Sequence, residues 1–213
     1  SPTIGSALRA PSLWSVTPYA RYDDMALLPS WQLTYDPQTW LTRNTSLGVL
    51  TKYRRDFAPL RTQVIVGADA EVSPGAFNAQ RAVVTRTGPA NAFSSFTPGE
   101  TQYDYDVTYR SASPYAHAEF SPLAALRIDA GLRADFSGYT YDTKLAPLDS
   151  GAHRRPASTT RSYAHLSPKL GASLAIDSST SLFASYRNGF RAPSQNQLFQ
   201  QNSAANTVDL APV

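Results

Sequence analysis

The chain has 213 residues, of which 42% are hydrophobic, and this content excludes a wholly disordered polymer. Charged residues make up only 16%, below the roughly 25% of a typical soluble domain, while tyrosine is abundant at 12 residues. The net charge of +3 is scattered without a long run of Lys or Arg, so nucleic-acid binding is not expected.

Cysteine is absent, which excludes disulfides and thiolate chemistry. No stretch approaches the roughly 18 consecutive apolar residues of a transmembrane helix, and no signal segment opens the sequence. The start at Ser1 and the end at Val213, within a polar stretch, lead us to expect a piece of a longer chain.

Alternation with a period of two recurs along the chain and predicts β-strands with one apolar face. In the first such segment, for example, Trp14 and Val16 share a face opposite Ser15 and Thr17. The predicted strands are residues 14–23, 46–54, 63–72, 114–120, 127–136, 164–176 and 182–191, with the tail of a further strand near residues 2–8.

The predicted connections alternate in length. Short turns are expected at residues 56–60, 121–126 and 177–180, and long polar connections at residues 27–42, 73–102, 144–161 and from 192 onward. Short periplasmic turns and long extracellular loops are typical of transmembrane barrels. A soluble antiparallel sandwich would explain the alternation equally well, but it gives no reason for the sorting of the loops.

The last third of the chain carries the most specific motif. Residues 167–175 read SPKLGASLA, and after the turn at residues 177–180 the segment 181–194 reads SLFASYRNGFRAPS. These stretches resemble the barrel of TonB-dependent outer-membrane receptors, in which a PKLG strand, a short turn and a YASYxxGFRAPS strand are readily recognised. Weaker similarity extends over residues 19–25, 46–54, 103–106, 113–120 and 126–133.

The resemblance implies an all-β fold, namely an antiparallel transmembrane β-barrel segment of about seven to eight strands from a larger barrel of about 22 strands. Residues 1–213 would all belong to the barrel domain. The plug domain of the family, its TonB box and the strands that follow an NPDLxPE-like stretch at residues 207–213 are not found. Such a segment by itself would leave two open sheet edges.

By the same resemblance, the whole protein is expected in the outer membrane of a Gram-negative bacterium, surrounded by lipid and lipopolysaccharide. It would take up a scarce nutrient, most often a ferric siderophore, with energy from the TonB complex delivered through the plug. A passive channel or structural barrel is the alternative, and a soluble β-sandwich adhesion module is a weaker one. No motif identifies the substrate.

The sequence contains no catalytic constellation, so the chain is not expected to be an enzyme. His117 and His165 lie on the polar faces of different predicted strands and His153 lies in a predicted loop, so no metal or acid–base site is expected. Ser185 and Ser194 lack a Gly-x-Ser-x-Gly turn, and no cofactor fingerprint is present.

Arg187 and Arg191 lie on the polar face of the last predicted strand, which would place them about 13 Å apart along the wall. The resemblance implies that this face lines the lumen, where both guanidinium groups would bind carboxylates and carbonyls of the plug. A hydrated face without a fixed partner is the alternative.

Ligand capture is expected in the long loops, where aromatic side chains offer rigid contact area and two arginines offer positive charge. The candidates are Trp31, Tyr35, Trp40, Phe93, Phe96, Tyr103, Tyr105, Arg154 and Arg155. Because a ferric siderophore is large, often anionic and partly aromatic, this mixture would suit it. Packing among the aromatic residues themselves, or against the membrane interface, is the alternative.

Overall fold

The computed structural model describes residues 12–28, 36–89, 92–204 and 207–213, with the backbone alone at residues 92 and 93. The strand tail expected near residues 2–8 and the ligand candidates Trp31 and Tyr35 lie outside the described residues. Among the described residues, no helix is long and apolar enough to cross a membrane.

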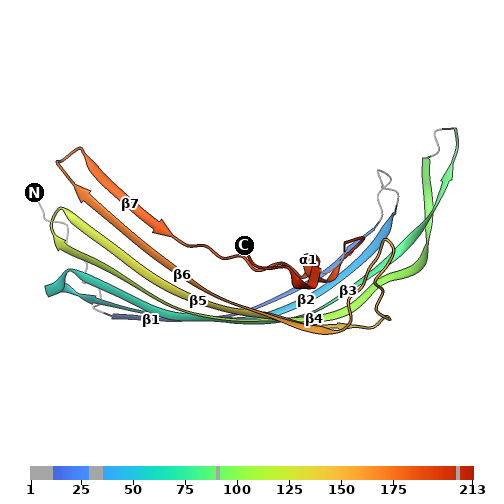
Figure 1. Ribbon diagram of the computed structural model, residues 1–213, viewed down its shortest axis with the longest axis horizontal. Helices are drawn as coiled ribbons and strands as arrows, with labels where there is room; N and C mark the ends of the chain where they lie inside the picture. The colour runs from blue at the N-terminus through green and yellow to red at the C-terminus, as the bar shows by residue number, and fades with distance from the viewer. Residues whose placement is uncertain (1–11, 29–35, 90–91, 205–206) are drawn as a thin grey trace, which may run out of the picture.

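The fold is one curved sheet of seven antiparallel strands that follow one another in chain order (Figure 1). The strands are β1 (Ser12–Leu27), β2 (Gln38–Phe57), β3 (Thr62–Thr87), β4 (Ala92–Leu123), β5 (Leu126–Thr143), β6 (Thr159–Ala175) and β7 (Ser181–Arg187). The seven predicted strands and the antiparallel barrel-segment arrangement are therefore confirmed, except that the last strand ends at Arg187 and not at residue 191. In the described residues the sheet is a trough with open edges at β1 and β7, not a closed barrel.

The register keeps the apolar alternates of every strand on one face. Trp14 pairs with Tyr53, Tyr53 with Val66 and Leu132 with Pro168. The apolar alternates of neighbouring strands oppose one another in the same way at other positions along these strands. Directly opposed residues in an antiparallel sheet point to the same side. The apolar positions predicted from sequence thus form one continuous face across all seven strands.

This apolar face is the convex one. The C-terminal segment lies on the concave side of the sheet (Figure 1), where its helix α1 (Gln195–Phe199) packs against Tyr105 and Tyr141. On each strand the tyrosine and the apolar residues occupy alternate positions and so lie on opposite faces of the sheet. Because the tyrosines point to the concave side, the apolar residues point to the convex side. Large side chains remain uncovered there, including Trp14 at 72% and Leu170 at 55% exposure. Because the described residues form one sheet with no second sheet on it, the sandwich alternative is wrong.

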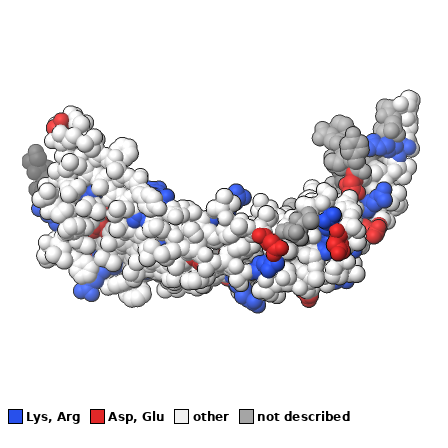
Figure 2. Space-filling model, viewed as in Figure 1, with Lys and Arg blue, Asp and Glu red and all other residues white. Residues whose placement is uncertain are grey.

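The two ends of the trough differ. At one end the turns are tight: the 3-10 helix η1 (Ala58–Leu60), residues 124–125 and residues 176–180. At the other end the β3–β4 hairpin rises far beyond its neighbours (Figure 1), and charged side chains gather there while most of the remaining visible surface is uncharged (Figure 2). This difference is the one expected between the periplasmic and extracellular ends of a membrane barrel.

The prediction of a long loop at residues 73–102 is wrong. β3 and β4 have 26 and 32 residues, and only residues 88–91 connect them. Cross-strand pairs of β-forming side chains, such as Phe77 with Tyr105, continue the ladder through this region. Prolines and glycines suggested a loop, but Pro74 and Gly75 pair in regular register with Thr108 and Val107, and Pro98 pairs with Ala82 beside a register shift.

Candidate functional site: the concave face

The concave face carries two zones of side chains. An aromatic zone lies toward the protruding end and consists of Trp40, Phe77, Tyr103, Tyr105, Tyr139, Tyr141 and Tyr163. A charged zone lies toward the tight turns and consists of Lys52, Asp69, His117, Arg133, Asp135, Lys169 and Arg187. The strand register brings each set together from four or more strands.

The C-terminal segment covers the aromatic zone. Leu198 and Phe199 of α1 are fully buried, and the ring of Phe199 stacks on Tyr141 with centroids 4.4 Å apart and an interplanar angle of 14°. The Tyr105 ring meets Phe199 edge-on at 6.5 Å, and its hydroxyl accepts a hydrogen bond from Gln200 at 3.3 Å. The part of the chain after β7 is therefore a strap packed inside the trough.

A capping box starts α1. The side chain of Ser194 accepts a hydrogen bond from the backbone N–H of Gln197, whose side chain in turn accepts one from the backbone N–H of Ser194. These bonds satisfy donors that the helix end would otherwise leave open. The serine of the FRAPS motif is thus a helix cap, a role that the sequence analysis did not identify, although the Ser-x-x-Gln spacing signals it.

Most ligand candidates with described positions lie on strands, so their predicted placement in loops is wrong. Trp40 lies on β2, and Phe93, Phe96, Tyr103 and Tyr105 lie on β4. Tyr103 and Tyr105 are only 2% and 0% exposed, because α1 and the following turn pack over them. The side chain of Phe93 lies outside the described residues.

Arg154 and Arg155 do lie in a loop, between β5 and β6, as predicted. The Arg155 side chain donates from Nε to the Ala146 carbonyl at 3.2 Å and from Nη1 to the Gln102 carbonyl at 2.9 Å. The backbone N–H of Arg154 donates to the carbonyl of Asn202 at 2.8 Å. This loop is thereby tied to both β4 and the C-terminal strap.

Asp36 links three segments at the same end. Its carboxylate lies 2.6 Å from His153 Nε2 and accepts hydrogen bonds from Gln38 at 3.1 Å and Gln102 at 3.4 Å. Burial by itself would raise the pKa of Asp36, but the Gln38 bond and the charge of His153 outweigh it, and the pKa falls below its ordinary value.

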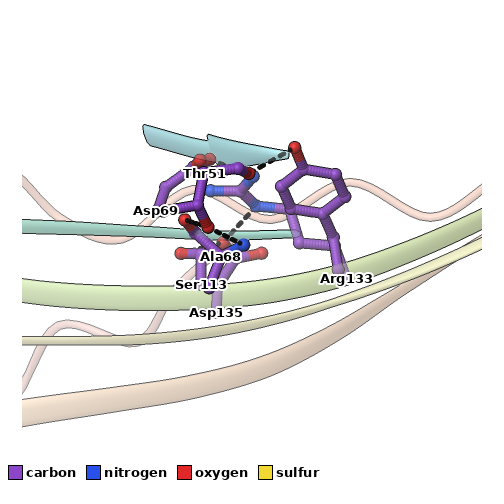
Figure 3. A network of polar contacts seen from close by, with 7 residues as sticks. Thr51, Ala68, Asp69, Ser113, Arg133 and Asp135 are labelled. Carbon is purple, nitrogen blue, oxygen red and sulfur yellow. Dashed lines mark hydrogen bonds and ion pairs between the residues drawn. The ribbon is translucent and has the colours of Figure 1, made fainter. Parts of the chain in front are cut away.

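In the charged zone, Arg133 joins three strands (Figure 3). Its Nη1 lies 2.9 Å from Asp69 of β3 and its Nε 2.7 Å from Asp135 of β5, while Ser113 of β4 donates to Asp135 at 2.8 Å. Two carboxylates around one guanidinium more than balance its charge and fix its orientation.

A glycine in the same zone lets a tyrosine cross a strand. Tyr115 of β4 lies over Gly67 of β3 and donates its hydroxyl to the Thr51 carbonyl of β2 at 3.0 Å. A Cβ atom on Gly67 would lie 2.6 Å from the tyrosine ring and 2.2 Å from that carbonyl oxygen. Only glycine leaves room for this contact.

An open groove of about 610 Å³ includes Asp69 and Arg133 of the network in its lining, together with Lys52, His117, Lys169 and Arg187. Arg187 is opposite Lys169 in the β6–β7 register and shares the concave face with it. Within the described part of the chain, Lys52, Lys169 and Arg187 have no carboxylate partner. These three unpaired cations outnumber the one carboxylate of the lining, Asp69, so this basic groove presents net positive charge to the interior of the trough.

Arg191 is not on the strand that carries Arg187. β7 ends at Arg187, and the Arg191 backbone pairs instead with Val213, through N–H···O distances of 2.8 and 3.1 Å. The predicted shared strand face, with its spacing of about 13 Å, is therefore wrong. Where the chain leaves the sheet, Phe190 stacks on His165, with centroids 4.8 Å apart and an interplanar angle of 8°.

Comparison with known proteins agrees with this geometry. The family model described as TonB dependent receptor-like, beta-barrel, matches residues 5–213. Among solved structures, the fold is similar to that of the copper transporter OprC, with a TM-score of 0.68 at 17% sequence identity. The similarity covers 97% of this chain and 33% of that one, so the chain spans about a third of the length of OprC. No curated protein matches the sequence.

Proposed function

This chain belongs to the TonB-dependent receptor β-barrel family, and we propose that it forms part of the barrel wall of an outer-membrane receptor that takes up a scarce nutrient with energy from TonB. The observation that carries the proposal is the opposition of two faces on one sheet, an apolar convex face and a charged and aromatic concave face. A wall between lipid and a polar lumen requires both faces.

We propose that the basic groove faces the plug of the intact receptor. Lys52, Lys169 and Arg187 would bind plug carboxylates there, the arginine in a bidentate geometry and the two lysines as point charges. Arg191 would face the same interior from the strap rather than from the wall. The net positive charge of the groove supports this assignment.

The substrate that we propose is a ferric siderophore, bound near the protruding end. Trp40, Phe96, Arg154 and Arg155 are the candidates whose side chains the structure describes at that end. Tyr103 and Tyr105 could contact a ligand only after the strap had moved away from them, because both rings are buried. Trp31, Tyr35 and Phe93 stay candidates on the sequence alone.

Uptake of radioactive iron tests this function. Cells that express the full-length receptor would be given iron as a siderophore complex, with and without a functional TonB, and copper ions would be supplied in a parallel assay. We expect uptake of the iron complex that disappears without TonB.

Uptake that persists without TonB would identify a passive channel instead. TonB-dependent uptake of copper without uptake of the iron complex would support the proposed transport function and contradict the ferric siderophore as its substrate. The copper arm is included because OprC, the similar structure, is named a copper transporter.

A further inference from the structure

The convex face changes composition sharply toward the protruding end. One row across the sheet is wholly apolar and consists of Pro18, Val49, Ala70, Ala112, Phe136 and Ala164. The next row consists of Ala20, Leu47, Val72, Arg110, Gly138 and Ser162. The row after it contains Thr108, Thr140 and Thr160. The apolar belt therefore ends, on β4 to β6, between the first two of these rows.

The height of the belt supports this boundary. On β6 the apolar alternation runs from Ala164 to Leu174. At ~3.3 Å per residue and a strand tilt of ~40°, this stretch rises about 25 Å along a barrel axis. The apolar band of an outer-membrane barrel is also ~25 Å tall. The row of Arg110 therefore lies where the outer leaflet places its headgroups.

Arg110 is exposed at this boundary beside a position without a side chain. Its neighbours in the row are Val72 on β3 and Gly138 on β5. A groove of about 500 Å³ opens here on the outer side of the sheet and is lined by Arg110, Ala112, Phe136, Gly138, Thr140, Thr160, Ser162 and Ala164. The groove thus combines one arginine and three hydroxyl-bearing side chains with apolar surface.

The charge of Arg110 is not compensated within the described part of the chain. Two other outward-facing cations have carboxylate partners, since Arg43 lies 3.3 Å from Asp24 and Lys144 lies 2.8 Å from Asp106. Arg110 has no such partner among the described residues. A bare guanidinium at an apolar boundary is stabilised by an anion.

We propose that this groove binds a phosphate group of an outer-leaflet lipid. Arg110 binds the phosphate oxygens, the hydroxyls of Thr140, Thr160 and Ser162 donate further hydrogen bonds, and the acyl chains lie over Ala112 and Phe136. The apolar floor below the arginine favours a phosphate that is attached to a lipid over free phosphate. The inference rests on the proposed function, because it requires the convex face to lie in the outer membrane.

The test uses the full-length receptor in phosphatidylcholine nanodiscs that contain increasing amounts of bisphosphorylated lipid A. Native mass spectrometry counts the lipid A molecules bound to wild type, to Arg110→Gln and to the matched control Arg43→Gln. We expect Arg110→Gln to weaken lipid A binding about tenfold, as loss of a charge-assisted hydrogen bond would, and Arg43→Gln to leave it unchanged. Wild type and Arg110→Gln should bind dephosphorylated lipid A with the same affinity.

Equal lipid A binding by wild type and Arg110→Gln would overturn the inference. Displacement of lipid A by millimolar inorganic phosphate would overturn the lipid as the source of the phosphate. Either result, obtained with a receptor that inserts into the bilayer and takes up its substrate through TonB, leaves the proposed function standing. A receptor that fails to insert into the bilayer would instead overturn the proposed function itself.

Discussion

Tyr115 and Tyr19 show how single glycines allow side chains to connect strands that are not neighbours. Tyr115 crosses β3 at Gly67, and Tyr19 crosses β2 at Gly48 to donate to Glu71 of β3 at 2.6 Å. Each hydroxyl thus bonds a strand that is two positions away from its own. Neither contact could be predicted from sequence, because each depends on the register between strands, which the sequence does not determine by itself.

We expect Gly67→Ala to destabilise the barrel by ~1–3 kcal/mol, since the new methyl group would overlap a backbone carbonyl that cannot rotate away. Gly189→Ala is the matched control, because a Cβ atom at Gly189 meets nothing within 4 Å. The measurement is denaturant unfolding of the full-length receptor in lipid vesicles. Equal unfolding midpoints for the two variants would show that the crossing contact is not tight.

Asp177 should make the β6–β7 turn sensitive to pH. Its carboxylate accepts hydrogen bonds from the backbone N–H groups of Ser179 at 2.8 Å and Thr180 at 2.9 Å, and these bonds lower the pKa of Asp177. The folded-state pKa therefore lies below the unfolded one. The contribution of this carboxylate to stability is present above the unfolded pKa and is lost as the pH falls through the folded pKa.

Amide hydrogen exchange of Ser179 and Thr180, expressed as protection factors, checks this expectation. Protection in the wild type should decrease upon acidification through the folded pKa of Asp177. In Asp177→Asn, which carries no titrating group at this position, protection should be lower at neutral pH and should stay constant. A wild-type protection factor that does not change with pH would contradict the role of the carboxylate.

The strands could be predicted from sequence where they cross the membrane and not where they leave it. Apolar and polar residues alternate where one face of a strand is apolar and the other polar, as at residues 164–174, but this pattern does not hold in the protruding hairpin of β3 and β4. Tyr105 is a strand residue whose ring contacts Phe199 of α1, a residue distant in sequence, and both rings are fully buried. The same strap took Arg191 off the strand where the pattern had placed it.

The packing of the C-terminal strap on the sheet should depend on the ring of Phe199. We expect Phe199→Ala to release α1 from the sheet, since truncation of a buried Phe costs ~3–5 kcal/mol and α1 is too short to be stable alone. Amide exchange at Leu198 and Gln200 should then become fast while exchange in β5 stays slow. Ser203→Ala, at an exposed position, is the control. Slow exchange at Leu198 in Phe199→Ala would mean that other contacts hold the strap.

At the scale of the whole molecule, the two faces of the wall should tolerate charge differently. We expect Leu170→Arg, on the convex face, to destabilise the full-length receptor by ~2–4 kcal/mol in a bilayer, because arginine is poorly solvated near the membrane midplane. Ser173→Arg, on the concave face of the same strand, should change the free energy of unfolding by less than ~1 kcal/mol. Equal penalties at both positions would contradict the assignment of the faces.

Solvent access to the two faces tests the membrane-wall claim most directly. This chain has no cysteine, so spin labels can be attached through single cysteines introduced at Leu132, Leu166 and Leu170 on the convex face and at Ser173 and Ser185 on the concave face. In the full-length receptor in a lipid bilayer, we expect oxygen to relax the convex labels strongly and a water-soluble nickel chelate to relax the concave ones. If the nickel chelate reaches the convex labels as readily as the concave ones, this sheet is not the wall of a membrane barrel.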